Sequence, residues 1–207
     1  MTLQQMLQWG AGWLKEREVP EADLNAWYLL ADCFQMERSG YFLHQEEEAD
    51  AGKEKKFRQM IEKRGQRIPL EYILGYTEFM GLKFEVDSHV LIPRQDTECL
   101  VEQVLPFCPG KKVLDLCTGS GCIGISLAVL GGPAAVVLAD VSGEALKVAE
   151  KNAENHGVKP VFCQGDLFEN VPADLFDVIV SNPPYIASEE IQKLMPEVQD
   201  HEPVLAP

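Results

Sequence analysis

Apolar residues in about the first 70 positions of the chain recur at the spacing of α-helices. One apolar stripe runs over residues 3–14 and a second over residues 22–34, with Pro20 suited to a helix start. Ser39-Gly40 is expected to break the helical pattern, and a charged helix is expected over roughly 46–65. The pattern predicts a small helical bundle at the N-terminus.

The pattern changes near residue 79. Alternating and clustered apolar residues predict two short strands, over 79–86 and 90–92, with a turn near Asp87-Ser88. These strands would form a hairpin that links the helical bundle to the rest of the chain. A helix capped by Asp96 or Thr97 is expected to follow.

Strands and helices alternate after this helix, which is expected to end at about Phe107. Short strands are expected over 113–117, 135–140, 160–164 and 176–181, and helices over 122–130 and 142–156. Such alternation predicts a parallel, doubly wound α/β sheet, in which ligands bind at the carboxyl ends of the strands. We therefore expect three parts: a helical domain over 1–75, a hairpin linker over 76–95 and an α/β domain over 96–207.

The charge of the chain disfavours a general nucleic acid binder. The formal net charge is −15, from 33 acidic and 18 basic residues, and such a surface repels phosphates. A basic stretch over 53–67 is interpreted as a solvated helix face, with a docking patch for an acidic or RNA-associated partner as the alternative.

The cysteines and the N-terminus indicate the redox state and the location of the protein. The six cysteines form no Cys-x-x-Cys pair and no zinc pattern, so we expect free thiols, no metal and a cytoplasmic location. The N-terminus has no signal-peptide pattern. Five glycines and Pro133 within the uncharged stretch 117–139 argue against a membrane span.

A glycine-rich loop is expected between the first strand and helix of the α/β domain. Gly119, Gly121 and Gly124 have the spacing of the dinucleotide fingerprint, in which the backbone turns sharply and the helix N-terminus faces a ligand. Asp140 ends the next strand, where a carboxylate can accept both hydroxyls of a ribose. These two features predict a nucleotide-like ligand and do not separate NAD from S-adenosylmethionine.

The loop after the third strand has residues that can bracket an adenine. Asp166 or a nearby backbone group can meet the exocyclic amine, and Phe168 can cover the face of the ring.

Asn182-Pro183-Pro184-Tyr185 follows the last apolar strand and carries the strongest chemical signal. The prolines hold the backbone rigidly, so the Asn182 side-chain oxygen and the Pro183 carbonyl can accept the two hydrogens of a planar amide or amino group. This contact directs the nitrogen lone pair toward an electrophilic methyl, and Tyr185 can stack on the planar group. A nicotinamide dehydrogenase would leave this motif unexplained.

Four segments together resemble the peptide chain release factor glutamine methyltransferases (the HemK/PrmC type). They are Arg67-Ile-Pro-Leu-Glu-Tyr-Ile-Leu-Gly75, Val90-Leu-Ile-Pro-Arg-Gln-Asp-Thr-Glu98, Leu114-Asp-Leu-Cys-Thr-Gly-Ser-Gly-Cys-Ile-Gly124 and Ser181-Asn-Pro-Pro-Tyr-Ile186. The second segment is the most specific to that family.

The resemblance implies a Rossmann-like class I S-adenosylmethionine-dependent methyltransferase domain behind an N-terminal helical bundle and a β-hairpin linker. It implies methyl transfer from S-adenosylmethionine to N5 of the glutamine in the Gly-Gly-Gln motif of class I release factors, leaving S-adenosylhomocysteine. The helical domain would hold the release factor, and we expect a monomer that binds neither nucleic acid nor membrane.

The resemblance also implies roles for individual residues. Asn182, Pro183 and Tyr185 would be catalytic, and Pro184 would join them in framing the glutamine amide. The cofactor contacts would be Cys117, Thr118, Gly119, Ser120, Gly121, Asp140, Asp166, Phe168 and Asn182.

The sequence departs from the family pattern at Cys117, where glycine is common, and at Gln95, where proline is common. The family sheet has seven strands, and about four are counted here, so we expect a truncated form with the strand over 177–181 at a sheet edge and weak or absent catalysis. The alternatives are a DNA or RNA amino-methyltransferase, and a truncated, non-catalytic module that binds a release factor.

Overall fold

The computed structural model describes residues 1–173, 175–185 and 194–203. The chain divides into two compact units, Met1–Leu74 and Gly75–Pro207. The hairpin that was expected to be a linker belongs to the second unit. Ile186, the last residue of the Asn-Pro-Pro-Tyr segment, lies outside the described residues.

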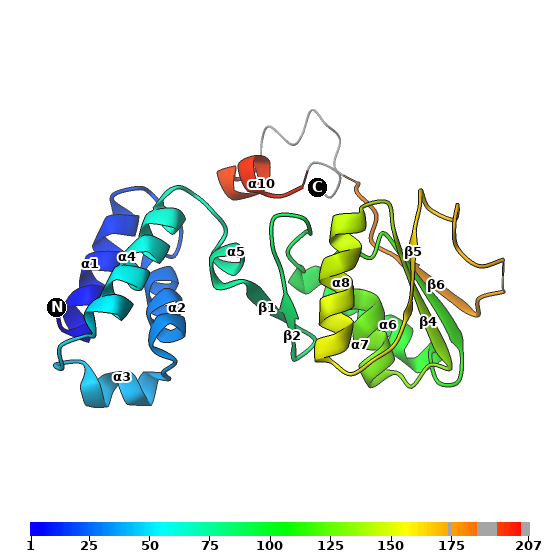
Figure 1. Cartoon of the computed structure of the whole chain (residues 1–207), viewed down its shortest axis with the longest axis horizontal. Helices are drawn as coiled ribbons and strands as arrows, with labels where there is room; N and C mark the ends of the chain where they lie inside the picture. Colours follow the sequence, from blue (N-terminus) through cyan, green and yellow to red (C-terminus); the bar gives the residue numbers. More distant parts are fainter. Residues whose placement is uncertain (174, 186–193, 204–207) are drawn as a thin grey trace. The chain divides into compact units, whose positions relative to one another are not determined.

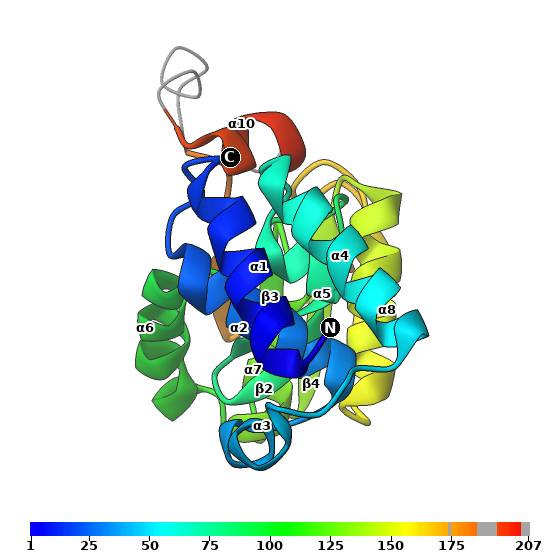
Figure 2. The same ribbon diagram turned by 90° about the vertical axis from the view of Figure 1, so that its left-hand side faces the viewer.

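The first unit is helical, as its apolar pattern predicts. Its helices are α1 (Leu3–Lys15), α2 (Ala22–Phe34), α3 (Arg38–His44), α4 (Ala51–Gly65) and α5 (Leu70–Leu74). Helices α1, α2 and α4 pack against one another around a core that includes Met6, Leu30 and Phe57 (Figure 1 and Figure 2). The charged helix expected over roughly 46–65 corresponds to α4, whose Phe57 and Ile61 are fully buried.

One expectation about the first unit is wrong, and a second holds for most but not all of its residues. Ser39-Gly40 lies inside α3 and does not break the helix. A helical glycine costs only about 1 kcal/mol, and Tyr41 of the same helix packs edge-on against Trp27 with ring centroids 5.5 Å apart. The basic stretch is not wholly solvated, because Arg64 is buried and its Nε donates a 2.6 Å hydrogen bond to Asn25 Oδ1.

The second unit begins with a hairpin of β1 (Tyr76–Phe79) and β2 (Leu82–Glu85). Its turn is Met80-Gly81, where both residues have positive φ, as a two-residue hairpin turn requires. The expected hairpin with a turn near Asp87-Ser88 and a strand over 90–92 is therefore wrong. The segment 86–94 is irregular, although Val90 and Ile92 are buried.

The remaining elements of the second unit follow the predicted alternation closely. They are α6 (Gln95–Val104), η1 (Leu105–Phe107), β3 (Lys112–Leu116), α7 (Cys122–Leu130), β4 (Ala135–Asp140), α8 (Gly143–Asn155), β5 (Val161–Gln164), β6 (Val178–Ser181) and α10 (Pro196–His201). Ser142 caps α8 as expected, with its hydroxyl accepting from the Ala145 N–H. Helix α6 begins after Arg94, so Asp96 and Thr97 lie in its first turn and do not cap it.

The four strands β3 to β6 form a parallel sheet in the order β5-β4-β3-β6. The chain moves outward from β3 to β5 and then returns to the other side of β3. The strand order therefore reverses beside β3, which is where ligands bind in open α/β sheets. In the described part of the chain β6 lies at an edge of the sheet, as expected.

Helices α6, α7 and α8 and the hairpin cover one face of the sheet (Figure 1). Ile125, Leu127 and Leu138 are fully buried in that layer. The other face carries a smaller cluster around Leu114, with Phe176 packed against it. The larger core therefore lies between the sheet and the layer that contains α7 and α8.

Asn152 of α8 joins the hairpin to the glycine-rich loop. The side chain is fully buried; its Nδ2 donates to the carbonyls of Glu85 (3.0 Å) and Ser120 (2.9 Å), and its Oδ1 accepts from the Glu85 N–H (2.7 Å). One side chain thus satisfies three backbone groups from two segments that lie far apart in the sequence.

We predict that Asn152→Ala destabilises the second unit by about 2 kcal/mol or more, because a buried polar group left without its partner costs about 1–3 kcal/mol. Urea unfolding followed by circular dichroism measures the loss, since all three tryptophans lie in the first unit. Asn155→Ala is the control: Asn155 donates to the Glu85 side chain in an exposed contact, and its loss should cost less than about 0.5 kcal/mol. Equal effects of the two substitutions would contradict this account.

Candidate active site

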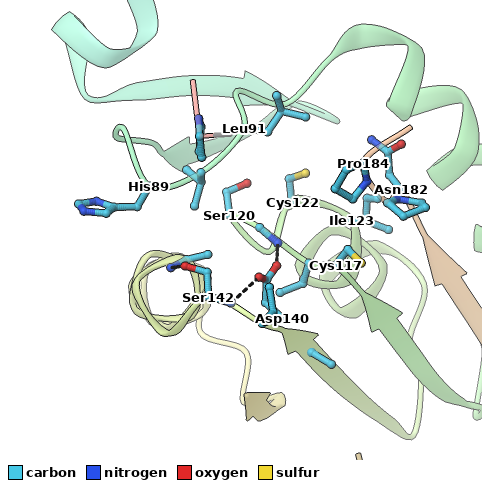
Figure 3. Close-up of a pocket in the computed structure, with 18 of the residues that line it drawn as sticks. His89, Leu91, Cys117, Ser120, Cys122, Ile123, Asp140, Ser142, Asn182 and Pro184 are labelled. Carbon is cyan, nitrogen blue, oxygen red and sulfur yellow. Dashed lines mark hydrogen bonds between the residues drawn. The ribbon is translucent and has the colours of Figure 1, made fainter. Parts of the chain in front are cut away.

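A cavity of about 600 Å³ lies at the carboxyl ends of the four parallel strands. Its wall takes residues from the ends of all four strands, with Cys117 after β3, Asp140 in β4, Gly165 after β5 and Asn182 after β6. Figure 3 shows Asn182 and Pro184 across the cavity from His89 and Ser142. The expectation that a site forms at this edge of the sheet agrees with the position of the cavity.

The turn from β3 into α7 uses left-handed backbone at alternate positions. Cys117 (φ 59°), Gly119 (φ 54°) and Gly121 (φ 81°) all lie in this region. At Gly121 a side chain would be strained by the positive φ, and its Cβ would lie 2.6 Å from Ile125 Cδ1. Cys117 adopts the conformation that the more common glycine would allow at less cost.

Gly124 lets α7 pack closely against the sheet. A Cβ at this position would lie 2.1 Å from Leu138 Cδ2 and 3.0 Å from Asp115 Oδ2. The Gly124 N–H donates to Asp115 Oδ2 (2.9 Å), which also accepts from the Thr118 hydroxyl (2.6 Å). Asp115 thus ties the start of α7 to β3, a role that the sequence pattern did not reveal.

Asp115 is fully buried, and its Oδ1 has no hydrogen-bond partner among the described residues. Burial raises the pKa of this carboxyl to about 7, and the two hydrogen bonds that Oδ2 accepts oppose the shift. Burial also raises the pKa of the Cys117 and Cys122 thiols, so both cysteines at the cavity stay protonated at neutral pH.

Asp140 holds the glycine-rich loop and the start of α8 together. Its Oδ2 accepts from the Gly119 N–H (2.8 Å) and its Oδ1 from the Ser142 N–H (2.9 Å), both drawn as dashed lines in Figure 3. Each carboxylate oxygen has two lone pairs, so each retains acceptor capacity toward the cavity. The carboxylate can therefore position the loop and bind a hydroxyl pair at the same time.

The end of β6 presents two oxygen acceptors. Asn182 Nδ2 donates to Thr97 Oγ1 (3.4 Å), and no described residue donates to Asn182 Oδ1 or to the Pro183 carbonyl. The Ser181 hydroxyl donates to the Leu116 carbonyl (2.8 Å), which ties β6 to β3 just before the motif. Asn182, Pro183 and Pro184 all line the cavity.

Most of the residues expected to contact cofactor or substrate line the cavity. They are Cys117, Thr118, Gly119, Ser120, Asp140, Asp166, Asn182, Pro183 and Pro184. Gly121, Phe168 and Tyr185 are not part of the lining: Gly121 is the cap of α7, and Phe168 and Tyr185 are 56% and 79% exposed. The roles proposed for Phe168 and Tyr185 therefore require a bound ligand or partner to cover their rings.

The cavity also has walls that the sequence pattern did not identify. The segment 89–94 contributes His89, Val90 and Leu91 in place of the expected strand, and Leu167 lines the cavity beside the exposed Phe168. Leu167 has positive φ (47°) and is itself 53% exposed. A loop wall of this kind has no periodic signal in the sequence.

Comparison with known proteins connects these features to a family. The sequence matches the PrmC N-terminal domain over residues 5–75 and the methyltransferase small domain over residues 94–199. A release factor glutamine methyltransferase from Geobacter sulfurreducens is 40% identical over 203 residues, covering 98% of this chain and 72% of the relative.

The chain belongs to the release factor glutamine methyltransferase family. A second relative of the same name, from Leptospira interrogans, is 40% identical and covers 93% of this chain and 70% of its own length. A third, from Bacillus cereus, is 36% identical and covers 98% and 74%. The family accounts for the class of the fold and for the methyltransferase motifs.

Two solved structures have limited similarity to the chain. The Pyrococcus abyssi tRNA (uracil-54, C5)-methyltransferase, in complex with S-adenosyl-L-homocysteine, has a TM-score of 0.45 at 22% identity, covering 56% of this chain and 30% of that chain. A ribosomal protein L11 methylase from Lactobacillus delbrueckii has a TM-score of 0.41 at 27% identity, covering 58% and 62%. Both TM-scores are low, and the family assignment does not rest on them. In the described residues no helix has the length and apolar character needed to cross a membrane.

We predict that Asp115→Asn makes stability less dependent on pH. The folded state binds the Asp115 proton more tightly than the unfolded state does, because its pKa rises from 3.8 to about 7. Stability should therefore fall, by on the order of 2 kcal/mol, as pH rises from about 5 to about 8. The variant should lack this loss and should exceed the wild type in stability above about pH 7.

Urea unfolding across this pH range measures the effect, with Asp166→Asn as the control for loss of an exposed carboxylate. Parallel pH curves for the wild type and Asp115→Asn would show that Asp115 is ionised in the fold at all these pH values.

Proposed function

We propose that this chain transfers a methyl group from S-adenosylmethionine to N5 of the glutamine in the Gly-Gly-Gln motif of class I peptide chain release factors, leaving S-adenosylhomocysteine and releasing one proton from N5 to solvent. The relatives named release factor glutamine methyltransferase support the reaction. The observation that carries the proposal is the pair of acceptors at the end of β6. Asn182 Oδ1 and the Pro183 carbonyl have no donor among the described residues.

The two acceptors match the chemistry of a glutamine side chain. An amide nitrogen is a poor nucleophile because its lone pair is delocalised into the carbonyl. Asn182 Oδ1 and the Pro183 carbonyl can accept its two hydrogens, which orients the nitrogen and favours the positive charge that develops on it. The two prolines hold these oxygens with little freedom, so orientation costs little entropy when the substrate binds.

The residues at the other side of the cavity fit the cofactor. S-adenosylmethionine, when bound, supplies an electrophilic methyl on a sulfonium centre. Asp140 can accept the ribose hydroxyls, and the backbone of Thr118–Ser120 can approach the ligand closely because the turn carries little side-chain bulk. Asp166 and Leu167 can bind the adenine by hydrogen bonding and apolar contact.

Tyr185 and Phe168 have roles that depend on binding. Both rings are largely exposed, so each has a free face for a planar group. Tyr185 follows the two prolines directly, and we assign it to the glutamine amide; Phe168 is assigned to the adenine. The first unit binds the release factor. The chain acts as a monomer in the cytoplasm.

We predict that incubation of the chain with S-adenosylmethionine and a class I release factor adds one methyl group to the glutamine of the Gly-Gly-Gln motif. Peptide mass spectrometry locates the modification. Asn182→Ala should reduce the rate about 100-fold or more, because it removes a preorganised contact to the reacting nitrogen. Asn155→Ala, whose side chain does not line the cavity, should retain the rate.

Calorimetry with S-adenosylmethionine separates failure of the reaction from failure of binding. Cofactor binding without methyl transfer would identify a non-catalytic module that binds a release factor. Methylation of a DNA or RNA base in preference to the release factor would overturn the proposed substrate. We do not expect this result, because the net charge of −15 repels phosphates.

A further inference from the structure

The first turn of α6 contacts three separate parts of the second unit. This turn lies in the segment Val90–Glu98, which is the most family-specific of the sequence motifs and has no chemistry assigned to it so far. Arg94, Thr97 and Glu98 each bind a different segment.

Two of these contacts hold the turn in place. Glu98 Oε1 accepts from the Met80 N–H (2.6 Å), which joins α6 to the tip of the hairpin. Arg94 Nη2 donates to both carboxylate oxygens of Glu202, at 2.6 and 2.8 Å. The Glu202 side chain is only 1% exposed, and Pro203, the next residue, lines the cavity together with Arg94. Charge-assisted contacts of this kind are short and directional, so the start of α6 is anchored on both sides.

The third contact reaches the proposed catalytic group. Thr97 lines the cavity, and its Oγ1 accepts from Asn182 Nδ2 at 3.4 Å. Among the described residues this is the only hydrogen bond of the Asn182 side chain. In this orientation the bond occupies the carboxamide nitrogen and leaves Oδ1 as the free acceptor, which is the atom that the substrate amide requires.

We propose that Thr97 is a positioning residue for Asn182. Its hydroxyl fixes the plane and the orientation of the Asn182 carboxamide, and Arg94 and Glu98 fix the place of Thr97. The proposal rests on the proposed function, in which Asn182 Oδ1 binds the amide that is methylated. A carboxamide that rotates freely would present nitrogen and oxygen in turn, and only the oxygen can accept a hydrogen from the substrate.

Thr97→Val tests this role, because valine has the shape of threonine without the hydroxyl. The turnover number kcat should fall about five- to tenfold, the size expected for one neutral hydrogen bond, while the KM for S-adenosylmethionine stays within about twofold. Thr97→Ser should restore the wild-type rate, since it keeps the hydroxyl. Thr77→Val, on β1 and away from the cavity, is the matched control and should leave both parameters unchanged.

The coupling between the two residues gives a sharper test. In the Asn182→Ala background, Thr97→Val should cause no further loss, because its effect passes through Asn182. A full additional loss in that background, or an unchanged kcat in the single variant, would overturn the proposal. Thr97→Ala replaces Thr97→Val if valine prevents folding.

A second measurement does not depend on activity. The side-chain NH₂ resonances of Asn182, assigned by their loss in Asn182→Ala, should shift in Thr97→Val and remain in place in Thr97→Ser. Unshifted resonances in Thr97→Val would overturn the proposal, even if the wild-type chain transfers no methyl group. Absence of methyl transfer by the wild type would instead count against the proposed function, so the two failures are distinguishable.

Discussion

The close packing of α7 on the parallel sheet is the constraint from which the site follows. Gly124 faces Leu138 and Asp115 with no room for a Cβ, and its N–H is bonded to the Asp115 carboxylate. The helix therefore starts directly behind the end of β3. The turn that joins them has to be short and sharp, and this requirement puts Cys117, Gly119 and Gly121 into left-handed backbone.

A small set of polar side chains then holds the segments around that turn in place. Asp140 binds the loop and the start of α8, and Asn152 binds the loop and the hairpin. Asn152 is fully buried, so breaking one of its bonds would leave a polar atom unsatisfied. The backbone around the cavity thus has few alternative conformations. A rigid backbone suits a site that must hold two reactants in a fixed orientation.

The opposite wall depends on contacts between segments that are far apart in the chain. Thr97 and Asn182 are separated by 85 positions and Arg94 and Glu202 by 108. The end of β6 lies beside β3 through strand pairing, and α6 reaches it because its first turn is held by the hairpin and by Glu202. The acceptor geometry at Asn182 is therefore a property of the assembled unit and not of the Asn-Pro-Pro-Tyr motif alone.

The elements of the sheet could be predicted almost residue by residue, since α7 and β4 match their expected bounds and Ser142 caps α8 as expected. The hairpin could not be predicted in this way. Its turn lies at Met80-Gly81 and not at Asp87-Ser88, so both strands lie earlier in the chain than expected. The roles of Asn152 and Asp115 could not be predicted either, because they lie in three-dimensional contacts that no local pattern encodes.

The sequence alone indicates which residues form helices, strands and a glycine turn, because periodicity, backbone freedom and proline govern these choices. Its motifs also identified the family. The assembled fold is needed to show that 86–94 is an irregular segment that helps line the cavity, that Phe168 and Tyr185 are largely exposed, and that Thr97 contacts Asn182. Such contacts depend on how distant segments pack, and packing is set by the shape and burial of all the side chains together.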